Sequence, residues 1–142
     1  GNKIDLGYDE EKYEEIKAYA EELGIAIPSL SSGLCWTYSL SADDPAERQK
    51  AHDMIVRQLY CAKMIGAETI LVIPGSVSVE FVPEWPVVPY DVVWDRALEQ
   101  VKKLAPIAKL PYANEKRAPP YPDRSLHLPR TIQPTNHHSH TK

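Results

Sequence analysis

The sequence predicts an α/β fold, part of a (β/α)8 barrel with about two parallel strands and three helices, followed by an irregular C-terminal tail. The main observation is a repeat. In residues 22–29 and again in residues 64–75, a helical pattern ends on a glycine, a short apolar run follows, and an Ile-Pro pair closes the run. A third unit is due after Lys109, but residues 110–114 contain neither a glycine stop nor an apolar run. The repeat therefore predicts a segment of an α/β repeat architecture over residues 1–109, taken below as part of a barrel, and the change in composition predicts a disordered tail over residues 110–142.

Composition is that of an ordinary domain and argues against several partners. The 142 residues are 43% hydrophobic and 25% charged, with a formal net charge of -4. This charge offers no basic surface, so neither nucleic acid nor an anionic membrane is an expected partner. No apolar run approaches the roughly 20 residues of a membrane span, and no signal peptide is evident, so a cytoplasmic location is expected. The widely spaced Cys35 and Cys61 suggest neither a disulfide scaffold nor a zinc site.

The first unit is predicted to consist of a helix over residues 9–23, a cap at Gly24 and a short buried strand over residues 25–29. The acidic residues of this helix are interpreted as solvated surface rather than as a cation site. A long loop over residues 30–42 follows. Its notable members are Gly33, Cys35, Trp36 and Tyr38.

The second unit has the clearest helix signals. Asp44 is placed to cap a helix, Pro45 suits its first position, and Glu47 completes a capping-box pattern. His52 falls off the apolar stripe and is expected to face solvent. A strand over residues 69–73 should be covered on both faces, because it is apolar without alternation. The apolar stripe of the helix, which runs up to Gly66, consists of Ala51, Met54, Ile55, Leu59, Ala62 and Ile65.

A third helix is predicted after a proline-rich loop over residues 74–89, in which Glu84 and Trp85 lie near the expected pocket mouth. Pro106 should kink this helix or end it early. The predicted apolar face consists of Trp94, Ala97, Leu98, Val101, Leu104 and Ala108.

Parallel strands joined by helices leave two architectures, a closed barrel and an open doubly wound sheet. The sequence contains neither of the glycine-rich phosphate-binding loops typical of open sheets that bind nucleotides. The loops after both strands are long and carry aromatic residues, which favours a barrel whose strand-end loops line a small-molecule pocket. A full barrel needs about 250 residues, so this chain is expected to hold less than half of one.

Three stretches, residues 24–29, 44–48 and 62–75, resemble the sugar-phosphate isomerase/epimerase group, whose members share the xylose isomerase-like TIM barrel with ketose 3-epimerases and endonuclease IV. The resemblance covers about Asp9 to Lys109. It implies proton transfer next to a sugar carbonyl, assisted by a divalent metal, commonly manganese.

In that family the metal ligands and catalytic carboxylates lie at the ends of later strands. No catalytic or metal-binding residue can therefore be assigned here, Glu115 is interpreted as tail, and the isolated chain is expected to bind no metal and to be inactive.

The resemblance implies a substrate-side lining after the second and third strands of such a barrel. Small residues allow sugar hydroxyls to approach closely, and a tryptophan gives an apolar wall for a sugar face. Ordinary loop packing is the alternative explanation for each residue. The predicted sugar-binding residues are Ser31, Ser32, Gly33, Trp36, Gly75 and Ser76.

Other functions remain open. One is a nuclease related to endonuclease IV, which the acidic charge disfavours. Another is a non-catalytic interaction fragment that self-associates through exposed strand edges.

A nucleophilic role for Cys35 is disfavoured because it has no cationic neighbour in the sequence. The cluster of His137, His138 and His140 is interpreted as tail. The abrupt change after Lys109 leads us to expect that the tail is a wrong-frame or misassembled translation.

Overall fold

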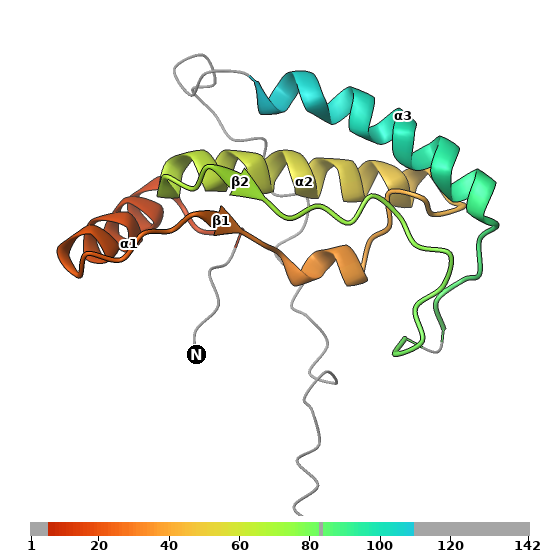
Figure 1. The fold of residues 1–142 in the computed structure, drawn as a ribbon, viewed down its shortest axis with the longest axis horizontal. Helices are drawn as coiled ribbons and strands as arrows, with labels where there is room; N and C mark the ends of the chain where they lie inside the picture. Colours follow the sequence, from red (N-terminus) through yellow and green to blue (C-terminus); the bar gives the residue numbers. More distant parts are fainter. Residues whose placement is uncertain (1–5, 83, 110–142) are drawn as a thin grey trace, which may run out of the picture.

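The computed structural model describes residues 6–82 and 84–109, and these residues form three α-helices and a two-stranded parallel sheet (Figure 1). The order is α1 (Glu10–Glu22), β1 (Ser29–Leu30), a short 3-10 helix η1 (Gly33–Trp36), α2 (Pro45–Ile65), β2 (Thr69–Ile70) and α3 (Tyr90–Ala108). The predicted partial barrel, with two parallel strands and three helices, is confirmed. The predicted tail, with Glu115 and the three histidines, lies outside the described residues.

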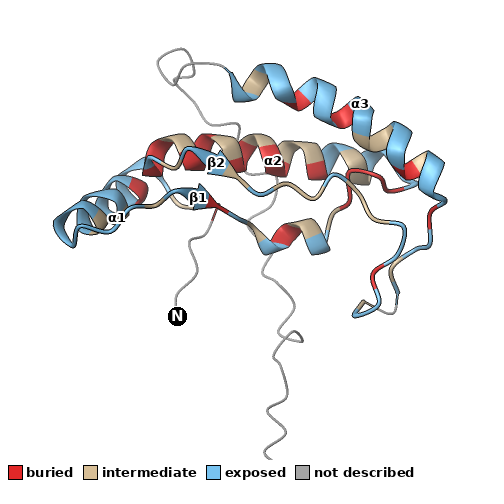
Figure 2. Cartoon of the chain, in the orientation of Figure 1, coloured by how far each residue is buried: buried red, intermediate tan, exposed pale blue. Residues whose placement is uncertain are grey.

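The long helix α2 is the centre of the fold. It packs against α1, α3 and both strands, and it lies behind the strand pair in Figure 1. The core residues of α2 that face these elements include Ala51, Met54, Ile55, Ala62 and Ile65, so five of the six predicted stripe residues are buried, while Leu59 is half-buried. With Tyr60, Cys61 and Met64, α2 supplies more than half of the buried core residues (Figure 2).

Helix ends follow the predicted signals with one exception. The Asp9 carboxylate accepts a hydrogen bond from the Lys12 backbone N–H, and Gly24 adopts φ +66° just after α1. Asp44 caps α2 by accepting from Ala46 N–H, and Gly66 ends it. The predicted capping box is wrong, because Glu47 Oε1 accepts instead from Ser39 N–H at 3.4 Å.

The strands are shorter than predicted. Ser29 pairs with Thr69 and Leu30 with Ile70, in place of strands over residues 25–29 and 69–73. Pro28 has no N–H to donate to a ladder, and the chain turns into η1 soon after Leu30, so the second strand loses its partner. The parallel pairing itself is confirmed.

Coverage of the strand segments on both faces was also predicted, and this prediction is wrong. Ile25 is 59% exposed and Leu71 is 61% exposed. Among the described residues α2 covers one face of the pair, and no other helix packs extensively on the strands. These strand segments therefore contain more apolar residues than the described fold buries.

The third helix packs with a face that only partly overlaps the predicted one. Its buried residues are Val93, Gln100 and Leu104, of which Leu104 was predicted, whereas Trp94 and Leu98 are exposed. The reason is that α3 lies on α2 and not on the strands (Figure 1), so the side next to the predicted stripe meets the core. Pro106 lies inside the helix, which continues to Ala108, so the predicted early end is wrong.

His52 is half-buried, so its predicted solvent-facing position is also wrong. Its Nδ1 lies 3.2 Å from Oε1 of the buried Gln100, across the contact between α2 and α3. Within the described ranges, none of the helices combines the length and apolar character that crossing a membrane requires.

Candidate functional site

The candidate site is formed by the two loops that follow β1 and β2. Because the strands are parallel neighbours, both loops leave the same end of the sheet, which is the end where barrel enzymes bind substrate. The first loop carries four of the predicted sugar-binding residues, and the second carries Gly75 and Ser76.

In the first loop, Ser32 begins η1. Its Oγ accepts a hydrogen bond from Leu34 N–H at 3.2 Å, and its carbonyl oxygen accepts one from the Cys35 thiol at 3.1 Å. Ser31 and Gly33 are exposed beside it. Ser32 therefore shapes the turn that presents Ser31, Gly33 and Trp36 at the surface.

The two loops meet through an aromatic pair. The rings of Trp36 and Phe81 lie 5.0 Å apart, edge to face, with an interplanar angle of 75°. Trp36 is 36% exposed and Phe81 is 63% exposed, so both present apolar surface to solvent. Such a pair can form one wall of a site for the apolar face of a small ligand. Sequence reasoning missed Phe81, although it is the sole phenylalanine of the chain and stands in a long loop after a strand.

Gly75 contacts a different part of the chain. A Cβ built on Gly75 would lie 2.9 Å from Ser41 Oγ and 2.9 Å from Val93 Cγ1. A side chain at position 75 would therefore clash with the 39–44 segment and with α3, and this packing accounts for the glycine. Ser76 next to it is half-buried, and sugar contact by either residue stays a prediction.

The 39–44 segment at the start of α2 is held by two arginines. Arg96 Nη1 donates to Ser41 O at 2.9 Å and to Asp43 Oδ1 at 2.7 Å, and Arg48 Nη1 donates to Ala42 O at 2.6 Å. Ser39 and Ser41 bond to each other through their hydroxyls at 3.0 Å and are buried. These contacts make the segment a rigid support for the second loop.

Cys35 is not prepared for nucleophilic chemistry. Burial raises the pKa of its thiol, and the backbone amides of Cys35 and Trp36 offset only part of that effect. A raised pKa leaves little thiolate at neutral pH.

The described residues do not fit a divalent metal. In residues 6–82 and 84–109, no three side chains of histidine, cysteine, aspartate or glutamate come together. A catalytic metal site needs about three protein ligands, so no catalytic step can be assigned to a metal held by these residues.

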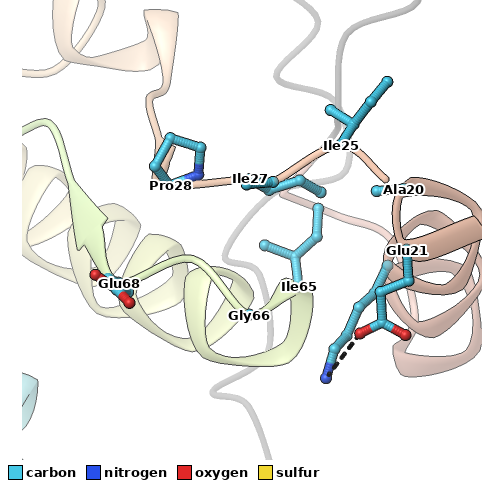
Figure 3. A pocket seen from close by; sticks show the side chains of 10 residues that line it. Ala20, Glu21, Ile25, Ile27, Pro28, Ile65, Gly66 and Glu68 are labelled. Atoms are coloured by element: carbon cyan, nitrogen blue, oxygen red, sulfur yellow. Dashed lines mark ion pairs between the residues drawn. The ribbon is translucent and has the colours of Figure 1, made fainter. Parts of the chain in front are cut away.

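A hollow of about 320 Å³ lies at the opposite end of the strands, between the ends of α1 and α2 (Figure 3). Ile25, Ile27 and Ile65 line it, and the Lys17–Glu21 ion pair, at 4.0 Å, borders it. In barrels this end serves stability, so the hollow is not the candidate site.

Comparison with known proteins agrees with this geometry. The sequence profile of the xylose isomerase-like TIM barrel matches residues 2–110. No curated protein and no solved structure gives a significant match. The profile covers most of the chain, and the described residues supply two of the eight parallel strands that such a barrel contains. The chain therefore belongs to the xylose isomerase-like TIM barrel family.

Proposed function

We propose that this chain is the substrate-side segment of a sugar-phosphate isomerase/epimerase, and that its own role is to bind a sugar or sugar phosphate without converting it. The observation that carries the proposal is the Trp36–Phe81 pair at the substrate end of two adjacent parallel strands. An exposed aromatic wall suits the apolar face of a sugar, and the Ser31 and Ser32 hydroxyls beside it suit sugar hydroxyl groups.

In the family, a divalent metal, commonly manganese, supplies charge stabilisation for proton transfer next to a sugar carbonyl. The residues of this chain would orient the sugar and exclude water from one of its faces. The residues that carry the proposal are an aromatic pair and two serines, so binding and orientation are what they contribute. A cytoplasmic location is part of the proposal.

The first experiment is a titration of the full chain with fructose 6-phosphate, in which ligand-observed NMR measures the binding. We expect weak, saturable binding with a Kd near 1 mM, which corresponds to about -4 kcal/mol. Fructose and inorganic phosphate, titrated separately, show which half of the ligand is recognised. If none of the three ligands binds saturably, the proposal is overturned.

Matched variants locate the site. Trp36→Ala should abolish saturation and Phe81→Ala should weaken it several-fold, because each removes part of the aromatic wall. Trp94→Ala, which removes a tryptophan from α3 that is more exposed than Trp36, should leave binding unchanged. Binding that survives Trp36→Ala would place the ligand elsewhere.

The inactivity of the chain is tested separately. Incubation with manganese and ketose phosphates should match the buffer blank, since the groups that lower the barrier are not placed by the described residues. Turnover that co-purifies with the chain would refute this part of the proposal while leaving sugar binding intact.

A further inference from the structure

Helix α3 exposes an apolar stripe beside the face that packs on α2. Tyr90, Trp94, Leu98 and Val101 are between 41% and 67% exposed. Spacings of four, four and three residues place them on one side of the helix. The exposed length of α3 is visible as pale blue in Figure 2.

The stripe is presented on a firmly held helix. Val93, Gln100 and Leu104 are buried on the α2 side, and Gln100 meets His52 across that contact. The rings of Tyr90 and Trp94 are stacked, with centroids 6.4 Å apart. Large aromatic residues on a rigid, solvent-exposed helix face are typical of protein interfaces.

A row of charges runs beside the stripe and changes sign along the helix. Asp91 and Asp95 stand in its first half, and Lys102 and Lys109 stand toward its end, at spacings of four, seven and seven residues. All four are exposed, and within the part of the chain that the structure describes none of them forms an ion pair. The acidic half of this face is therefore complementary in charge to the basic half of the same face on a second, antiparallel copy.

We propose that this face binds a second copy of the chain, with the two α3 helices packed antiparallel about a twofold axis near Leu98. In this register Trp94 lies opposite Val101, and Asp95 of each copy lies near Lys102 of the other. A parallel arrangement would instead set acid against acid and base against base. Because a twofold interface is self-complementary, each favourable pair occurs twice.

The size of the surface suits a reversible dimer. A helix of 19 residues is about 28 Å long, so the stripe extends over most of its length. One helix pair buries less than a standard interface of about 800 Å² per partner, so we expect a concentration-dependent equilibrium rather than a permanent dimer.

Sedimentation equilibrium of the full chain over a wide concentration range tests the proposal. We expect a monomer–dimer equilibrium whose Kd rises at least about tenfold in Leu98→Glu, because two carboxylates would meet at the axis. The control is Leu23→Glu at the C-cap of α1, which places the same charge at a similarly exposed leucine and should leave the Kd unchanged. Circular dichroism should show equal helix content in both variants.

The direction of packing is tested by charge reversal. Asp95→Lys and Lys102→Asp should each raise the Kd several-fold, and the double variant should restore it to within about threefold. Antiparallel packing alone makes these two positions partners.

Three results would overturn the proposal. The first is a monomer at every concentration. The second is an oligomer unaffected by Leu98→Glu, which would point to the strand edges. The third is a double charge variant no better than the single ones, which would exclude this register.

Discussion

The side-chain amide of Gln58 donates a hydrogen bond to the carbonyl oxygen of Leu30, over 2.9 Å, from the middle of the central helix to the end of the first strand. The same amide lies 3.2 Å from Leu71 O, and Leu71 N–H in turn donates to Leu30 O at 3.0 Å. Gln58 is 1% exposed. One buried side chain thus joins α2 to the point where both strands give way to the loops of the candidate site.

Gln58→Met should therefore destabilise the chain by about 1–3 kcal/mol, because it removes both hydrogen bonds: Leu71 O loses the amide donor, and Leu30 O keeps only Leu71 N–H. Urea unfolding followed by circular dichroism measures the loss. The control is Gln49→Met on the same helix, where the lost partner, Asp53, is solvent-accessible and the cost should be a few tenths of a kcal/mol. Equal losses in the two variants would contradict this role for Gln58.

Gly75→Ala should destabilise by about 1–3 kcal/mol, since the new methyl group would approach Ser41 Oγ and Val93 Cγ1 to 2.9 Å. Thermal unfolding is the measurement. Combining the change with Val93→Ala should cost less than the sum of the two single changes, because the smaller side chain makes room. Strict additivity would show that the two positions do not touch.

Arg57→Met should loosen the segment before α1. The buried guanidinium donates from Nε to Leu6 O and from Nη2 to Tyr8 O, each at 2.7 Å. Hydrogen bonds from a charged donor are worth about 1.5–3 kcal/mol, and their loss should appear as faster amide hydrogen exchange near residues 6–8. Lys50→Met, an exposed change on α2, is the control and should leave this exchange unaltered.

The Cys35 thiol should react slowly with iodoacetamide at neutral pH, because burial raises its pKa and lowers the thiolate fraction. The folded chain holds this proton more tightly than the unfolded chain. The resulting stabilisation is complete below the unfolded pKa and is lost as the pH rises through the folded one.

The measurement for Cys35 is the alkylation rate as a function of pH, with Cys35→Ser to identify the signal. The fully buried Cys61 serves as an unreactive internal reference. A rate at neutral pH equal to that of an exposed cysteine peptide would contradict the prediction.

The helix ends were predictable because they depend on local chemistry, and the parallel strand pairing was predictable because strands joined by one helix usually lie side by side. Asp9, Asp44 and Gly66 act within one turn of their own helices, so the signal lies in adjacent residues. The candidate loops were predictable as segments, since they follow the two apolar runs. Phe81 was not, because its meeting with Trp36 joins positions 45 residues apart.

The sequence by itself determined the α/β order, the family and the boundaries of α1 and α2, because capping and periodicity are properties of neighbouring residues. Only the tertiary structure decided which side of α3 is buried, how few residues of each strand pair, and where Glu47 and His52 find their partners. An apolar pattern indicates only that a helix face is suited to burial. Which face is buried depends on the element that packs against it, and for α3 that element is α2.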